Sequence, residues 1–191
     1  MNFQPLGIEG VMQVDVEAAA DARGSFARLH CEREFESRGL AQRMVQTSVS
    51  HSRQHGTVRG MHFQWPPSRE GKLVRCIRGA VFDVVIDLRP DSPDYTRHLS
   101  LELSAASRRA VFIPPGLAHG FQTLEDDVEV LYQMTGFYEP ALAAGVRWND
   151  PAFGIAWPLP AAAIHERDAA YSDFDAVRFA DEYGARSSRS D

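Results

Sequence analysis

Apolar and polar residues alternate along short stretches in the middle of the chain, which is the pattern of half-buried β-strands. In segment 98–103 leucine occupies every second position, and segment 128–134 alternates in the same way. Segment 81–88 is rich in β-branched and aromatic residues and ends at the turn cluster Arg89–Pro93. The strands that we predict are Gly7–Val16, Arg43–Ser50, Val58–Phe63, Lys72–Ile77, Val81–Leu88, His98–Leu103, Ala110–Ile113 and Val128–Met134.

About ten short strands separated by turn signals predict an all-β fold: an antiparallel sandwich, jelly roll or barrel. Helical signal is limited to Glu32–Arg38 and to the Ala-rich stretch Ala161–Tyr183, for which we expect short helices within an irregular arm. The 191 residues fit one domain, 1–191, with a C-terminal arm from about residue 160. We expect a flexible tail from about residue 184, with Ser187–Asp191 disordered.

The composition narrows the classes of partner. The formal net charge is −6, whereas nucleic-acid-binding domains usually carry a basic footprint. No apolar run approaches the length of a membrane span, and Met1–Gly10 lacks the basic and apolar regions of a signal peptide. Cys31 and Cys76 give no disulfide framework. We therefore expect a cytoplasmic protein with reduced thiols and with neither nucleic acid nor membrane as a partner.

Positive charge gathers in one part of the chain. Nineteen of the 20 basic residues are arginines, and Lys72 is the single lysine. Between Arg53 and Arg78 there are six basic side chains and one acidic residue, Glu70. Lysine alone offers a compact point charge with a tunable pKa, which makes Lys72 a functional candidate. A positive cavity would suit an anionic ligand such as a diphosphate, and a solvated, salt-bridged surface is the alternative.

Histidine 62 lies between Met61 and Phe63, so on a strand it points away from both. If those two residues face the outside of a sheet, His62 faces inward. A structural histidine is the alternative interpretation, but the nearby Lys72 and Arg59 favour a functional one.

A second histidine follows a tight turn. Segment 114–121 has the pattern P-x-G-x-x-H, in which proline and glycine deliver His119 to the start of a strand. The pattern resembles the second motif of the cupin superfamily, jelly-roll barrels that often use this histidine as a metal ligand. A metal cupin would also need H-x-H in the earlier motif, where this chain has His62-Phe63-Gln64. The donor set is too poor for a first-row metal, so we predict no metal site.

Several stretches together resemble the dTDP-4-dehydrorhamnose 3,5-epimerase family in order and spacing, over about residues 5–175. They are Asp21–Phe26, Val58–Gln64, Gly71–Cys76, Ile113–Phe121, Trp148–Pro151 and Ile155–Pro158. Each is weak alone, but jointly they are specific. The resemblance implies a cupin jelly-roll barrel and a homodimer that exchanges strands between subunits. It also implies an epimerase without metal or cofactor, acting on a nucleotide sugar.

The resemblance also implies roles for individual residues. His62 matches the catalytic base, Asp168 the carboxylate paired with it, and Tyr132 the proton donor on the opposite face. Lys72 matches the cation near the sugar 4-keto oxygen. The residues that match substrate-binding positions are Arg23, Phe26, Gln46, Arg59, His119 and Tyr138.

The chemistry of epimerisation explains these residue types. A C–H beside a ketone is a weak acid, so its removal needs a base and stabilisation of the enolate oxygen. A histidine with a pKa of about 6.5 suits neutral pH, and an aspartate fixes its tautomer. A positioned base contributes about 10²–10⁴-fold in rate, and a cation at the oxyanion about 10²–10³-fold. Inversion at C3, at C5 or at both then needs an acid on the other face, which a tyrosine can supply. The chain has no G-x-G-x-x-G fingerprint, in agreement with a reaction without a redox cofactor.

Other interpretations stay open on the residues alone. Tyr132 can be a core residue of its strand, Asp168 a solvated turn residue, and Asp83 a buried structural carboxylate. A keto-isomerase or dehydratase of the same cupin group would share His62 and the positive cavity. A non-catalytic cupin that binds sugar nucleotides would need Arg59 and His119 but not the full catalytic set.

The chain departs from the family pattern near the positions that contact the nucleotide base. Arg28 stands where family members usually carry a glutamate, and the stretch Gln46–Ser50 differs from the usual Gln-x-Asn-x-Ser. Since this exchange reverses a charge, we predict that the base or the sugar differs from the commonest dTDP substrate, with CDP and other dTDP sugars as candidates. Equilibrium binding of dTDP and CDP tests the prediction, and a clear preference for dTDP would contradict it.

Overall fold

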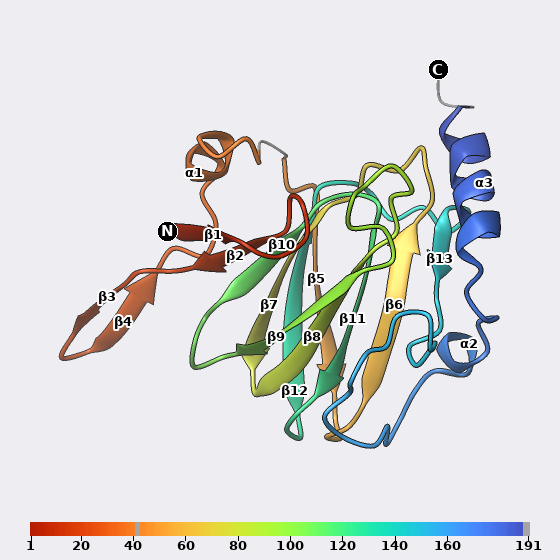
Figure 1. Cartoon of the computed structure of the whole chain (residues 1–191). Coiled ribbons are helices and arrows are strands. Elements are labelled where there is room, and N and C mark those ends of the chain that lie inside the picture. The colour runs from red at the N-terminus through yellow and green to blue at the C-terminus, as the bar shows by residue number, and fades with distance from the viewer. Residues whose placement is uncertain (41–42, 189–191) are drawn as a thin grey trace.

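Two antiparallel sheets face each other in the computed structural model, which describes residues 1–40 and 43–188 (Figure 1). The first sheet contains, in spatial order, β1 (Asn2–Pro5), β2 (Met12–Asp15), β10 (Ala110–Ile113), β7 (Lys72–Arg78), β12 (Val128–Met134) and β5 (Gln46–Ser52). The second contains β13 (Ala143–Gly145), β6 (Val58–Gln64), β11 (Leu117–Thr123), β8 (Ala80–Asp87) and β9 (His98–Ser104). A separate hairpin of β3 (Ala18–Asp21) and β4 (Gly24–Ala27) projects from the barrel.

Three short helices complete the described part of the chain: α1 (Glu32–Glu36), α2 (Glu166–Ala169) and α3 (Ala176–Ser187). The predicted all-β fold of antiparallel strands with a few short helices is confirmed. α3 continues to Ser187, past residue 184 where the expected tail begins, and residues 189–191 lie outside the described part. No helix of the described residues is long and apolar enough to cross a membrane.

The strand pattern did not predict every strand. The hairpin β3–β4 was missed because Ala18–Asp21 contains no β-branched or aromatic residue. The pattern also missed β1, which has four residues and ends in a proline, and β13, which has three. Such short strands form because a neighbouring strand supplies hydrogen-bond partners, which local sequence does not reveal.

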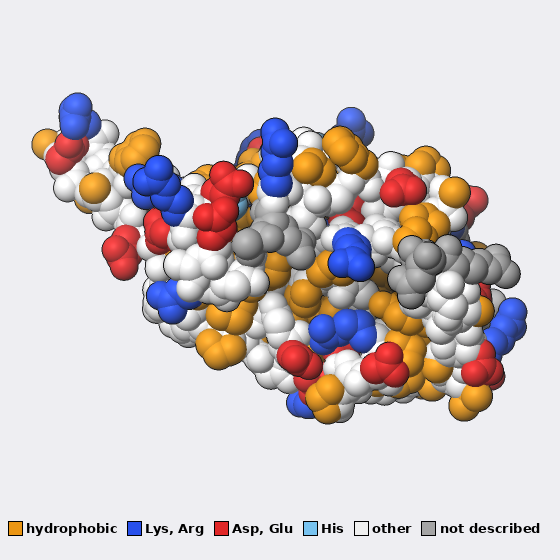
Figure 2. Space-filling model, turned by 90° about the horizontal axis from the view of Figure 1, so that it is seen from above, with side chains coloured by type: hydrophobic (Ala, Val, Ile, Leu, Met, Phe, Trp, Pro, Cys, Tyr) orange, Lys and Arg blue, Asp and Glu red, His pale blue; other side chains and the backbone are white. Residues whose placement is uncertain are grey.

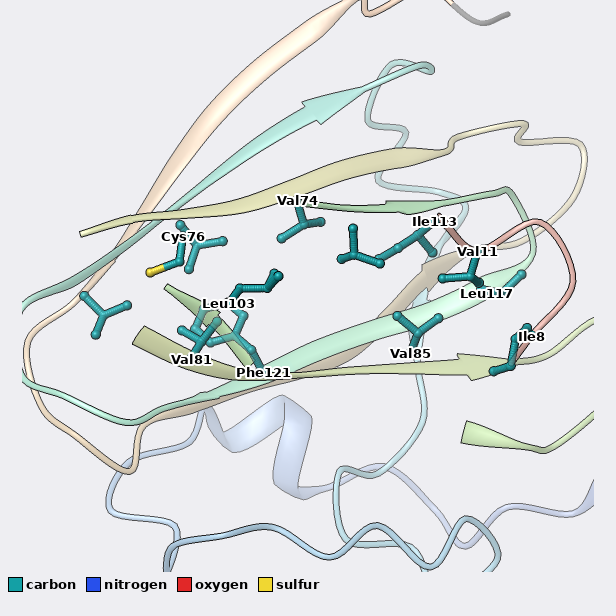
Figure 3. Close-up of a cluster of buried hydrophobic side chains, with 13 residues drawn as sticks. Ile8, Val11, Val74, Cys76, Val81, Val85, Leu103, Ile113, Leu117 and Phe121 are labelled. Carbon is teal, nitrogen blue, oxygen red and sulfur yellow. The ribbon is translucent and has the colours of Figure 1, made fainter. Parts of the chain in front are cut away.

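The side chains between the two sheets form the main core. Val74 of β7 and Ile113 of β10 point toward Val85 of β8 and Phe121 of β11 (Figure 3). Because side chains alternate along a strand, the neighbouring residues point outward. On the second sheet, outward residues such as Met61 pack in a separate cluster under the C-terminal segment with α3.

A β-bulge in β6 changes this alternation at one point. His119 of β11 pairs with His62, but Phe121 pairs with Arg59, so three steps along β6 match two steps along β11. The extra residue turns Arg59 and His62 to the same side of the sheet, which strict alternation would forbid. The strands can approach closely here because Gly60 and Gly120 have no side chains: a Cβ on Gly60 would lie 2.5 Å from the Gly120 Cα.

We predict that Gly120→Ala destabilises the fold by about 1–3 kcal/mol, because overpacking a tight interior costs about this much. The added Cβ would lie 2.6 Å from the Met61 Sδ and 2.7 Å from the Arg59 carbonyl oxygen. Gly184→Ala is the matched control, because a Cβ there meets nothing within 4 Å and helix α3 favours alanine. Urea unfolding measures both free energies, and equal stabilities of Gly120→Ala and the unmutated protein would contradict the prediction.

Candidate active site

The inward faces of four strands carry polar side chains beside the core. His62 of β6 and His119 of β11 come from one sheet, and Lys72 of β7 and Tyr132 of β12 come from the other. Met61 packs in the outer cluster, so His62 points inward as predicted. These four side chains line a cavity of about 460 Å³ together with Arg59, Asp168 and Arg167.

His62 forms a hydrogen-bonded pair with Asp168. The imidazole Nε2 lies 2.8 Å from the Asp168 Oδ1. The carboxylate side chain is 4% exposed, whereas the imidazole is 38% exposed and reaches the cavity. Since the carboxylate accepts the Nε2 proton, the neutral ring carries its lone pair on Nδ1.

The C-terminal arm brings Asp168 to the barrel. Backbone hydrogen bonds attach the arm to the start of β6, from Val58 N to Ala163 O and from Ala162 N to Gly56 O. The side chain of His165 then caps α2 by accepting a hydrogen bond from Arg167 N, at 3.1 Å from Nδ1. This cap fixes the turn that presents Asp168 to His62.

The surroundings of His62 favour its neutral form. Burial lowers the pKa of this imidazole, the Asp168 carboxylate opposes the change, and the positive charges of Arg167 and Lys72 lower the pKa further. The net direction is downward from the ordinary value. At neutral pH the ring is therefore ready to accept a proton.

Tyr132 comes from the opposite wall of the barrel. Burial raises the pKa of its phenol far above the ordinary value, so the hydroxyl stays protonated at neutral pH. Its ring meets the ring of His119 edge-on, with the centroids 5.9 Å apart. This contact and the alternation of β12 fix the orientation of the phenol.

Lys72 lies next to Tyr132 on the same sheet and has a carboxylate partner. Its Nζ is 2.9 Å from the Glu70 Oε1, and the Glu70 Oε2 accepts a hydrogen bond of 2.9 Å from Gln64 Nε2. The Lys72 side chain is only 16% exposed. The ammonium group is thereby held at a defined position in the cavity wall.

Two further predicted residues lie around the same cavity. Arg59, turned inward by the bulge, donates from Nε to the Ser52 hydroxyl and from Nη2 to the His51 carbonyl. His119 is buried and its Nε2 lies 2.8 Å from the Asp83 Oδ2. Burial raises the pKa of the Asp83 carboxyl, whereas the neighbouring His119 lowers it. Asp83 is thus the buried partner of a site histidine.

A second cavity of about 420 Å³ adjoins the first and shares His62, Lys72, Tyr132 and Arg167 with it. Gln46 and Tyr138 line this second cavity, and the Gln46 side chain accepts a hydrogen bond from the Tyr138 backbone. The structure therefore brings eight of the ten predicted site residues together around two connected cavities.

The structure does not bring Arg23 and Phe26 to these cavities. Both lie on the projecting hairpin, where the Arg23 side chain is 90% exposed and Phe26 is 78% exposed. Arg23 contacts Asp21 of the same hairpin. Within a single chain the two residues cannot contact a ligand bound near His62. Arg28 is likewise absent from the lining of both cavities and lies 3.4 Å from Glu34.

Three residues of the site gained no role from the sequence. Arg167 precedes Asp168 and lines both cavities, Glu70 pairs with Lys72, and Asp83 pairs with His119. Asp83 gave a signal as a charged residue inside an apolar strand, and Glu70 as the one acid in a basic segment. No sequence signal identified Arg167.

Among the residues that the structure describes, no group of three or more histidine, cysteine, aspartate or glutamate side chains could hold a metal ion. A barrel with a His–Asp pair on one wall and a phenol on the opposite wall is suited to proton transfer at carbon. A base and an acid can then approach a bound ligand from two sides. Fold and site thus define a cupin-type enzyme for proton transfer.

Comparisons with known proteins specify the family. The model of the dTDP-4-dehydrorhamnose 3,5-epimerase family matches residues 5–176. The dTDP-4-dehydrorhamnose 3,5-epimerase of Sinorhizobium fredii is 43% identical over 158 residues, which are 83% of this chain and 81% of that protein. The dTDP-4-dehydrorhamnose 3-epimerase of Streptomyces niveus is 42% identical over 169 residues, 88% of this chain and 81% of that protein.

A solved structure of the same family is similar to this chain in its fold. A crystal structure of dTDP-4-dehydrorhamnose 3,5-epimerase from Bacillus anthracis, with TDP and PPi bound, matches with a TM-score of 0.88 and 32% identity. The match covers 91% of this chain and 99% of that one. The chain therefore belongs to the dTDP-4-dehydrorhamnose 3,5-epimerase family.

Proposed function

We propose that this protein is an epimerase that inverts C3, C5 or both in a nucleoside-diphosphate 4-keto-6-deoxyhexose. One observation carries the proposal: the His62–Asp168 pair and Tyr132 lie on opposite walls of one cavity, with Lys72 beside them. The relatives include both a 3,5-epimerase and a 3-epimerase of dTDP-4-dehydrorhamnose, which supports both patterns of inversion.

His62 acts as the base in this proposal. Its Nδ1 takes the proton from the carbon beside the ketone, while Asp168 holds the Nε2 proton and stabilises the imidazolium that forms. The electron pair of the broken C–H bond moves toward the keto oxygen and gives an enolate. Lys72 places its positive charge beside that oxygen, because an oxyanion gains most from a charge that is already positioned.

Tyr132 completes the inversion from the other face. Its phenol donates a proton to the carbon, where the C=C electron pair of the enolate forms the new C–H bond, the oxygen becomes a carbonyl again, and the configuration is reversed. His62 then releases its proton to solvent and the phenolate takes one up, so atoms and charge balance. No electrons are exchanged, and the reaction that we propose needs neither a metal nor a redox cofactor. Metal analysis of the purified active protein tests this point.

We also propose that the protein works as a homodimer in the cytoplasm. Among the described residues, the strands of the hairpin β3–β4 pair only with each other, and the hairpin projects from the body of the molecule (Figure 2), which it contacts through a hydrogen bond from Arg108 to Ser25. Since an isolated two-stranded hairpin is marginally stable in water, a surface of a second copy would stabilise it. Arg23 and Phe26 would then reach the cavity of the partner subunit. Both cysteines are free thiols, as expected in a reducing compartment.

We predict that His62→Ala abolishes hydrogen exchange at both C3 and C5, because it removes the base that Asp168 holds in the described structure. Tyr132→Phe should spare exchange more than inversion, since removal of the proton precedes its action. Incubation of nucleotide 4-keto-6-deoxyhexoses in D₂O, followed by NMR, measures both. Tyr95→Phe is the control, because the Tyr95 hydroxyl bonds to the Ala176 carbonyl outside the cavities.

Other outcomes of this exchange experiment would contradict the assignment of the base or indicate a different function. Full turnover by His62→Ala would contradict the assignment of the base. Exchange at other atoms would indicate a keto-isomerase or dehydratase, and binding without exchange in the unmutated protein would indicate a non-catalytic cupin.

We predict that two inactive chains complement each other. In a heterodimer of His62→Ala and Arg23→Ala, one cavity keeps its own His62 and receives Arg23 from the other subunit. Co-expressed chains should therefore regain activity that neither homodimer shows. Failure to regain activity in a purified heterodimer would contradict the exchange of hairpins, and a monomer in sedimentation would contradict the dimer.

A further inference from the structure

Arg167 lies against the His62–Asp168 pair and has no role in the mechanism above. Its Nε donates to the Asp168 Oδ1 at 3.2 Å, and its Nη2 lies 3.2 Å from the His62 Nε2. The guanidinium is 57% exposed and lines both cavities. The side chain therefore contacts the base and its partner without being needed to fill the core.

One oxygen of Asp168 carries both contacts. The Oδ1 accepts from the His62 Nε2 at 2.8 Å and from the Arg167 Nε at 3.2 Å. A charge-assisted hydrogen bond from a guanidinium fixes the direction of a carboxylate. It also neutralises part of the negative charge that would otherwise attract a proton to the imidazole. The Nη2 group cannot donate to Nε2 while that nitrogen donates to Asp168, so there it acts as a charge.

We propose that Arg167 is a positioning residue of the base, which orients the Asp168 carboxylate and sets a positive charge against the edge of the His62 ring. This inference rests on the proposed function only in that His62 is the group whose state matters for turnover. The contact itself is a property of the folded chain.

The charged and titratable groups around His62 come from every neighbouring element. They are Arg59 on its own strand, Lys72 on β7, His119 on β11, Tyr132 on β12, Glu70, Tyr138 and Tyr171 in the lining of the second cavity, His165 at the cap of α2, and Arg167 and Asp168 on α2. Burial contributes most to the lowered pKa of His62, Asp168 opposes it, and Arg167 and Lys72 add to it. Within the described part of the chain, Asp168 is the anion in hydrogen-bonding contact with the imidazole, whereas Glu70 is paired with Lys72, and Arg167 moderates the effect of Asp168.

The charge of Arg167 affects the pH at which activity is lost. A base works only in its neutral form, so activity falls as the pH drops through the pKa of His62. Because that pKa is lowered, the fall lies below the ordinary value of about 6.5. Removing the charge of Arg167 would raise the pKa and move the fall to higher pH, while the rate well above pH 8 would change little.

Two substitutions of Arg167 test the proposal. Arg167→Gln should move the acid limb of the exchange rate upward by about half a unit to one unit, which is roughly a three- to tenfold loss on that limb. NMR titration of the His62 ring should show the same upward shift without any substrate. Arg167→Lys keeps the charge and should stay closer to the unmutated protein. Because the side chain is exposed, we expect both variants to fold.

Two control variants accompany the titration of His62, one with an expected shift in the opposite direction and one with no expected shift. Asp168→Asn should move the titration of His62 the opposite way, because it removes the opposing anion. Arg178→Gln removes an exposed arginine of α3 that is outside both cavities and should change nothing. An unshifted His62 titration in Arg167→Gln, with an equal rate loss at all pH values, would overturn the proposal. A shifted titration in a protein that never catalyses exchange would support it and refute the proposed function instead.

Discussion

The hydrogen bond between His62 and Asp168 joins parts of the chain that are 106 residues apart, and the organisation of the site depends on it. The barrel alone supplies an imidazole, a phenol and an ammonium group. The C-terminal arm, attached along the start of β6, adds the carboxylate that fixes the tautomer of the imidazole. The arm therefore does more than cover the outer face of the second sheet, because it fixes which ring nitrogen of His62 carries the proton.

The sequence predicted those parts of the site that depend on strand alternation. His62 could be assigned to the inward face because Met61 and Phe63 are apolar, and Lys72 and Tyr132 lie on inward faces of regular strands. Arg59 breaks the rule, because the bulge in β6 turns it inward, so strand alternation could not place it, and its site role came from the basic segment and the family resemblance. Asp168 was likewise known only by resemblance, because a turn residue in an irregular arm has no periodicity to interpret.

The cations that line the cavities differ in their partners: some contact a carboxylate, and Arg59 contacts neutral groups. Lys72 contacts Glu70, and Arg167 contacts Asp168, so each of these cations has an anion within hydrogen-bonding distance. Among the described residues, the hydrogen-bond partners of Arg59 are neutral groups, the Ser52 hydroxyl and the His51 carbonyl. If the function that we propose is correct, this arrangement makes the charge of Arg59 available to a phosphate, while Lys72 and Arg167 keep fixed positions.

Because Lys72 is the single lysine of the chain, it is the single side chain with an amine that can be modified chemically. The chain carries a single ε-amino group, that of Lys72, and it lies in the cavity that His62 lines. The other amine, at Met1, is engaged by Glu34, which raises its pKa and lowers its nucleophilicity. Amine-directed reagents, including the active esters used to attach proteins to surfaces, therefore meet two amines that are each paired with a carboxylate, and the one on a side chain lies in the wall of the cavity.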